Sequence, residues 1–108
     1  MSSTKKSISP VGERLQAART AKGISQKQLG ILAGIDEFSA SPRINQYERN
    51  KHVPDYATAQ RLAKALSIPV TYLYADNDRL AELILLFASA NKSAQDQSLQ
   101  TLKDHHKK

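Results

Sequence analysis

The sequence contains no cysteine and no tryptophan, and it has only 4 glycines and 4 prolines among 108 residues. Without cysteine the chain can form no disulfide framework, thiolate zinc site or iron–sulfur site. The longest apolar run, residues 83–88, is far shorter than the roughly 20 residues that span a bilayer. Residues 1–10 have lysines but no apolar stretch behind them, so they do not form a secretory signal. These absences favour a small, soluble, intracellular domain with no membrane partner.

The positive charge of the chain is concentrated in its first part. Residues 1–75 hold 11 basic and 5 acidic side chains, whereas residues 76–108 hold 5 of each. The formal net charge of +6 therefore lies entirely in the first part. A concentrated basic excess suggests a polyanionic partner, although charge alone fits solubility equally well.

Helical signals dominate from residue 11 onward. Apolar residues recur at helical spacing from Val11, and Gly23 ends the pattern, which predicts a first helix. Ser25 followed by Gln28 is the pattern of a capping box, so we expect a short second helix to begin there. Gly34 ends this second helix.

The segment after Gly34 predicts a loop. Residues 35–42 are rich in short polar side chains, and Ser39 and Ser41 are rival N-caps for the next helix. That helix carries Ile44 on its apolar face and closes at Asn50, a residue type that tolerates the left-handed conformation.

The remaining pattern predicts only further helices. The expected segments are a helix from about Asp55 to Ser67, a short helix after Pro69, a helix capped by Asp76, Asn77 or Asp78, and a last helix beginning at Ser93. The expected fold class is all-α, with five helices to about residue 75 and one or two more after it. Residues 1–10 are expected to form a flexible basic arm, and residues 104–108 a frayed tail.

Two short helices separated by Gly34, in a small basic all-α domain, are what a helix-turn-helix requires. The N-terminus of one helix attracts a phosphate through its free backbone amides and its positive dipole end. The next helix enters the major groove, where its side chains reach base edges.

As an ordered set, the motifs resemble the Cro-type, lambda-repressor-like helix-turn-helix family, the xenobiotic response element regulators. They are Ser25-Gln26-Lys27-Gln28-Leu29-Gly30, Ala33-Gly34-Ile35, Ile44-Asn45-Gln46-Tyr47-Glu48-Arg49-Asn50, Pro54, Leu62-Ala63-Leu66, Pro69-Val70 and Tyr72-Leu73. The resemblance covers roughly residues 11–75. It implies a five-helix DNA-binding domain there, followed by a helical dimerisation segment at 76–103.

The resemblance also implies roles for individual residues. Base contacts from the recognition helix fall to Ser39, Ser41, Arg43 and Gln46. Contacts with the DNA backbone fall to Ser25, Gln26, Lys27, Asn45 and Lys51. An amide can pair bidentately with adenine, and a guanidinium with guanine. Arg19 and Glu48 match a pair that bridges the first helix to the recognition helix, and we expect an ion pair between them.

The chain departs from the family pattern before the recognition helix. Ile44 follows Gly34 by ten positions, about four more than is usual in that family, so we expect an extended turn within residues 36–41. Pro42 then falls in the first helical turn. Direct base readout at that position is lost there, or an apolar contact with a thymine methyl group replaces it.

The segment from Leu80 to Phe87 is too apolar for a lone exposed helix. It either packs back on the domain or pairs with a second copy of the chain. We expect pairing, because residues 76–108 carry no net charge that would repel a second copy. The predicted contact residues are Leu80, Leu83, Ile84 and Phe87. A two-fold dimer would place the recognition helices about 34 Å apart and require an inverted-repeat site.

The sequence therefore predicts a dimeric, sequence-specific, double-stranded DNA-binding repressor in the cytoplasm, at the nucleoid. One alternative is an antitoxin or adaptor that holds a partner protein with its C-terminal apolar helix, and another is a non-specific nucleoid binder. We expect no enzyme, cofactor or small-molecule ligand, because no Gly-rich phosphate loop or Ser/His/Asp set stands out. His52, His105 and His106 lack further ligands for a metal.

Overall fold

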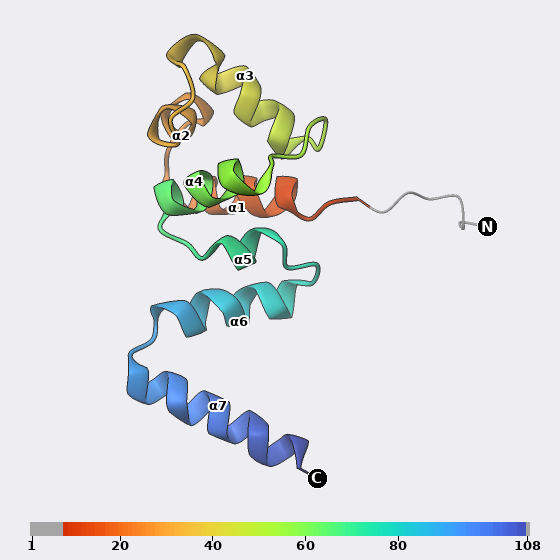
Figure 1. Cartoon of the computed structure of the whole chain (residues 1–108), viewed down its shortest axis with the longest axis vertical. Helices are drawn as coiled ribbons and strands as arrows, with labels where there is room; N and C mark the ends of the chain where they lie inside the picture. Colours follow the sequence, from red (N-terminus) through yellow and green to blue (C-terminus); the bar gives the residue numbers. More distant parts are fainter. Residues whose placement is uncertain (1–7, 108) are drawn as a thin grey trace, which may run out of the picture.

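The computed structural model describes residues 8–107, and all regular structure in that part of the chain is helical (Figure 1). The helices are α1 (Val11–Lys22), α2 (Gln26–Leu32), α3 (Glu37–Glu48), α4 (Tyr56–Leu66), α5 (Val70–Leu73), α6 (Asp78–Ser89) and α7 (Lys92–His106). Helices α1 to α5 gather into one group, α6 lies along it beside α5, and α7 extends away (Figure 1). Most of the predicted basic arm lies outside the described residues.

The core of the group is built from all of its helices. Each of α1 to α5 contributes a fully buried aliphatic side chain, and these are Leu15, Leu29, Ile44, Leu62 and Leu73. Removing such a side chain from water stabilises the fold by roughly 1.5–3 kcal/mol. The five helices therefore share one core, and that core sets the position of α3.

The predicted capping signals of α1 and α2 are present. Gly23 ends α1 with a left-handed φ of 77°. The Ser25 hydroxyl oxygen accepts the Gln28 backbone N–H at 3.0 Å, and the Gln28 side-chain oxygen accepts the Ser25 backbone N–H at 2.8 Å. This reciprocal pair fixes where α2 begins and satisfies two backbone donors that lack intrahelical partners.

The prediction of a loop over residues 35–42 is wrong. Helix α3 begins at Glu37, because the Asp36 carboxylate accepts the Phe38 backbone N–H at 3.0 Å and caps the helix. Neither Ser39 nor Ser41 is an N-cap, since both lie inside α3. Pro42 is also inside the helix, where its missing N–H removes one intrahelical hydrogen bond. The additional residues thus lengthen the helix rather than the turn.

The C-terminal helices also differ in their ends from the prediction. Asn77, one of three candidates, caps α6 by accepting the Leu80 backbone N–H at 2.8 Å. The cap of α7 is Asn91 and not Ser93, and its side chain accepts the Ala94 N–H at 2.8 Å. Helix α7 runs to His106, so residues 104–106, for which the sequence predicted fraying, are helical.

Residues 8–107 contain no helix with the length and apolarity needed to cross a membrane. In the same residues, no three His, Asp or Glu side chains gather as a metal site would require.

Every buried side-chain nitrogen or oxygen described has a hydrogen-bond partner. The polar groups near α3 are therefore arranged as a satisfied network.

Candidate nucleic-acid interface

Two glycines allow close approach of neighbouring helices to α3. A Cβ added to Gly30 of α2 would lie 2.6 Å from the Ala40 Cβ, and one added to Gly12 of α1 would lie 2.6 Å from the Glu48 carbonyl oxygen. Both distances are below van der Waals contact, so a side chain at either position would force the helices apart. The two glycines therefore let α2 and α1 pack closely against α3, one near each of its ends.

A polar network joins α1, α2 and α3 around Glu48, whose side chain is only 2% exposed. The Arg19 guanidinium donates through Nε to Glu48 Oε2 and through Nη2 to Oε1, the latter at 3.1 Å. Gln26 Nε2 donates to Glu48 Oε1 at 3.0 Å and to Asn45 Oδ1 at 3.2 Å. The structure thus brings together the two residues of the predicted ion pair, and the buried carboxylate has a charged partner.

This network changes the part that Gln26 can play. Its amide nitrogen has two hydrogens, and both are directed at α3. The donors left at this end of α2 are the backbone N–H groups of the first two helical residues, Gln26 and Lys27, which need no partner inside the helix. A phosphate at this helix N-terminus would meet those amides, while the Gln26 side chain braces α3.

The other residues predicted to contact the DNA backbone lie around the same end of the domain or just after α3. Ser25 and Lys27 are exposed at the start of α2, and the Lys27 ammonium lies 3.7 Å from the Glu37 carboxylate. Lys51 is exposed in the loop after α3, which Asn50 starts with a φ of 58°. Asn45 is half-buried, with its oxygen in the network.

The predicted base-contact residues do not all share one side of α3. Gln46 and Ser39 are seven positions apart and half-buried, and Arg43 lies between them and is exposed. Ser41 lies seven positions before Glu48, so the two share a side of the helix, and Glu48 points into the domain. The structure groups Ser39, Arg43 and Gln46 and leaves Ser41 apart from them.

A shallow groove of about 300 Å³ runs along this outer side, and Arg43, Gln46, Tyr47, His52 and Val53 line it. Sequence reasoning missed His52 and Val53 here. They reach the groove because the loop after α3 folds back, with the His52 backbone N–H donating to the Gln46 carbonyl at 3.3 Å. The left-handed Asn50 starts this return, but no sequence signal shows that residues 52 and 53 then reach the groove.

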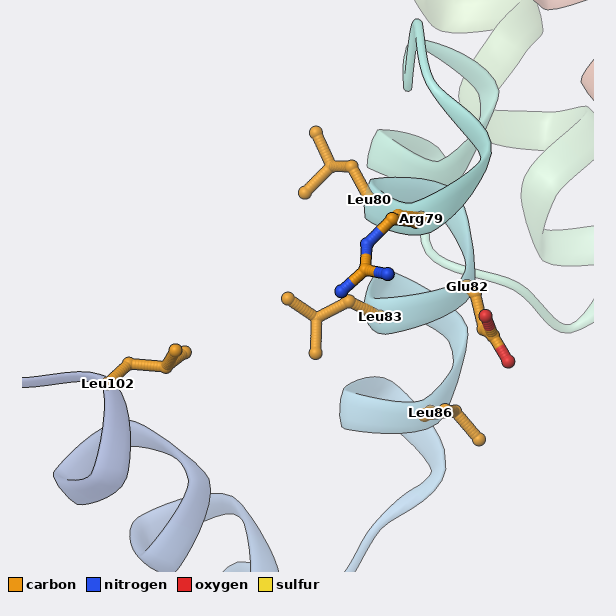
Figure 2. A pocket seen from close by; sticks show the side chains of 6 residues that line it. All are labelled: Arg79, Leu80, Glu82, Leu83, Leu86 and Leu102. Carbon is orange, nitrogen blue, oxygen red and sulfur yellow. The ribbon is translucent and has the colours of Figure 1, made fainter. Parts of the chain in front are cut away.

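The residues predicted for dimerisation lie on two sides of α6. Ile84 packs against the core with Leu85, whereas Leu80 and Leu83 are 42% and 44% exposed, and Phe87 is half-buried. Leu80 and Leu83 point into an open groove of about 540 Å³ between α6 and α7, as does Leu102 (Figure 2). One side of α6 therefore packs back, and the other side is open.

The helix-turn-helix domain family matches residues 12–79, and the chain belongs to that family. This match and two similar proteins confirm the predicted class, a helix-turn-helix regulator of transcription with an all-helical fold. The crystal structure of transcriptional regulator BswR is 48% identical, with a TM-score of 0.81 over 86% of this chain and 92% of that one.

A curated relative is an uncharacterized transcriptional regulator in the ATPase CF(0) region of Rhodospirillum rubrum. It is 30% identical over 69 residues, which are 64% of this chain and 60% of that protein. The chain thus spans less than two thirds of this relative. Both relatives are named as transcriptional regulators. Together with the helix-turn-helix family of this chain, they imply DNA-binding regulation.

Proposed function

We propose that the protein binds a specific double-stranded DNA site as a homodimer and represses transcription by occupying that site. In this proposal residues 11–75 are the DNA-binding unit. Helix α3 enters the major groove with Arg43 and Gln46 toward base edges, and the N-terminus of α2 lies on a phosphate. This arrangement is that of a non-enzymatic binding protein.

The observation that carries the proposal is the buried network around Glu48. It fixes α2 and α3 relative to each other through Arg19 and Gln26, and it uses no side chain of the outer groove. Side chains that read bases must be held in place by a rigid support. Arg43 and Gln46 stand on such a support and remain open to a ligand.

The electrostatic contribution comes from the basic first part of the chain. Lys27, Arg43, Arg49 and Lys51 are exposed on α2, on α3 and in the loop that follows. Each phosphate that such a cation neutralises releases counterions, so the affinity falls with salt concentration. Contacts of this kind position the protein, whereas Gln46 and Arg43 supply sequence preference.

Dimerisation is supported by the state of the C-terminal helices, which we propose as the interface within residues 76–103. Helix α7 has 15 residues and no buried one. An isolated helix of that length is marginal in water. Leu99 and Leu102 of α7 are 43% and 55% exposed, and Leu80 and Leu83 of α6 are exposed as well. A second copy of the chain would cover both sets.

The DNA-binding part is tested by selecting bound sites from a randomised duplex pool at near-physiological salt. We expect enrichment of an inverted repeat. Gln46→Ala should then weaken binding to the preferred site by about 1–3 kcal/mol and relax preference at one position. Gln60→Ala, an exposed glutamine on α4, is the matched control. Retention without enrichment would instead indicate a non-specific binder.

The dimer is tested by sedimentation of the purified chain over a concentration series. We expect Leu83→Glu to shift the chain to monomer, whereas Leu32→Glu, an equally drastic change at a 60% exposed leucine of α2, leaves the dimer intact. A wild-type monomer that retains no DNA and aggregates would overturn the proposal. It would favour an antitoxin or adaptor that covers the same leucines with a different protein.

A further inference from the structure

We propose that Phe38, in the additional turn of α3, contacts thymine methyl groups in the major groove and adds a requirement for thymine to each half-site. This inference rests on the proposed function, since it assigns a further specificity residue to the same helix. It concerns the residues that lengthen α3 and not the positions matched to the family motifs.

The first observation is exposure. Phe38 is 90% exposed, more than any other large hydrophobic side chain in residues 8–107. A phenyl ring that its own domain leaves in water gains free energy when a ligand covers it.

The second observation is position along α3. Phe38 and Pro42 are four residues apart, and so are Pro42 and Gln46, so the three lie one above the other on one side of the helix. Ala40 and Ile44 are buried on the other side. The helix that carries Gln46 to a base edge therefore carries Phe38 to the same groove about two turns away.

The third observation is that the additional turn is held in place at three points. Asp36 caps it, Ala40 packs against Gly30, and the Glu37 carboxylate faces the Lys27 ammonium at 3.7 Å. The phenyl ring thus stands on a fixed backbone, which lowers the entropy that binding would cost. In the same contacts each acidic side chain of this turn has a partner, since Asp36 accepts a backbone N–H and Glu37 lies beside an ammonium.

The side chains of Phe38, Pro42 and Gln46 together favour a duplex that contains thymine. In the major groove, thymine presents a methyl group and its partner adenine presents an acceptor and a donor. Phe38 and Pro42 fit the methyl group, and the Gln46 amide fits the edge of adenine. A duplex is favoured over a partner protein here because the first part of the chain carries the entire positive excess, which the phosphate backbone complements.

The test uses the site obtained by selection, in duplexes where deoxyuridine replaces one thymine at a time. This replacement removes only the methyl group. We expect the wild-type chain to lose about fourfold in affinity at one or two thymines of each half-site. Phe38→Ala should lose at least that factor on the unmodified site and be insensitive to deoxyuridine at the same positions. Tyr56→Ala, at a 59% exposed aromatic residue of α4, should keep the wild-type pattern.

The outcomes are separable from those of the proposed function. If the wild-type chain enriches a site but Phe38→Ala binds it equally well, the inference is overturned and the proposed function stands. An equal deoxyuridine penalty in the wild type and in Phe38→Ala overturns it as well, because another residue then reads the methyl group. If the wild-type chain retains no duplex at all, the proposed function itself fails. Matching thermal melts of the two proteins exclude a folding defect, since Phe38 is exposed.

Discussion

Helices α1 to α5 and helices α6 and α7 are equally regular, but they are supported differently. Each of the first five contributes a fully buried aliphatic side chain to one core. Helix α6 has one buried residue, Ala81, and α7 has none. The first region is therefore stabilised by its own chain. The second has helical caps and helical spacing, but little tertiary packing of its own.

This difference shows that an apolar pattern can predict a helix without predicting that its apolar side is buried. In α4 the pattern at Ala59, Leu62 and Leu66 predicts burial, and these residues are buried. In α7 the spacing of Leu99 and Leu102 predicts a helix equally well, yet both side chains are exposed. Local periodicity thus specifies the helix and its apolar side, whereas the surface that covers that side is a separate question.

The largest expected difference in stability between the two regions comes from truncating a leucine to alanine in each. Leu62→Ala should lower the free energy of unfolding by about 2–5 kcal/mol, because it opens a cavity in the shared core. Leu102→Ala in α7 should change the unfolding of the dilute chain by less than about 0.5 kcal/mol. Urea denaturation of both variants measures the difference. Equal losses would show that α7 belongs to the same cooperative unit as α1 to α5.

A second contrast is between a buried and an exposed ion pair. Glu48→Ala leaves the Arg19 guanidinium, which is 16% exposed, without its carboxylate. This change should lower the free energy of unfolding by about 3 kcal/mol. Asp96→Asn removes the exposed pair between Lys92 and Asp96 on α7 and should cost at most about 0.5 kcal/mol. Thermal unfolding gives both values.

A double-mutant cycle on Arg19 and Glu48 sharpens that prediction. Because the two side chains contact each other directly, we expect their substitution energies to be non-additive by more than about 0.5 kcal/mol. Additive effects would mean that the other partners of Glu48, such as Gln26, hold it without help from Arg19.

The order and number of the helices followed from capping residues and periodicity, but the start of the recognition helix did not. Asp36 followed by Glu37 is itself a helix-start signal, yet Pro42 and two serines favoured a later start. The decision depended on tertiary contact, since Ala40 packs on Gly30 only if residues 37–40 are helical. An insertion of about one helical turn also preserves the side on which Ile44 and Gln46 lie.

The candidate site was predictable where it depended on helix positions and was not predictable where it depended on loops or exposure. Arg19 and Glu48, far apart in sequence, meet as the family resemblance implied. His52 reaches the groove only through a returning loop, and the exposure of Phe38 cannot be read from a segment interpreted as a turn. The burial of Arg14, a charged residue that is 8% exposed, also depends on tertiary contacts that the sequence does not indicate.

The buried Arg14 joins the two regions. Its Nε donates to the Ala75 carbonyl at 2.9 Å, its Nη1 donates to Asp78 at 2.9 Å, and its guanidinium lies 5.9 Å from the centre of the Tyr72 ring. Arg14→Ala should lower the free energy of unfolding by about 2 kcal/mol, because it leaves the Ala75 carbonyl without its charged donor. Asp78→Asn should cost under about 1 kcal/mol, since that carboxylate is 90% exposed.

Hydrogen exchange of α6 amides in these two variants distinguishes the roles. We expect faster exchange throughout α6 in Arg14→Ala and little change in Asp78→Asn. Unchanged exchange in both would show that Ala81 and Ile84 alone hold α6 against α5.

The smallest expected effect is a pH dependence confined to the well-packed region. The Asp55 carboxylate caps α4, and hydrogen bonds from the side chain and then the backbone of Thr58 hold the pKa of Asp55 below its usual range. A carboxyl whose pKa is lower in the folded state stabilises that state at neutral pH. This stabilisation is lost as the pH falls below roughly 4 and through the folded-state pKa. Asp55→Asn keeps a capping oxygen without the charge, so its melting temperature should fall less than that of the wild type between neutral and acid pH. Parallel curves for the two proteins would assign the acid sensitivity to other carboxylates.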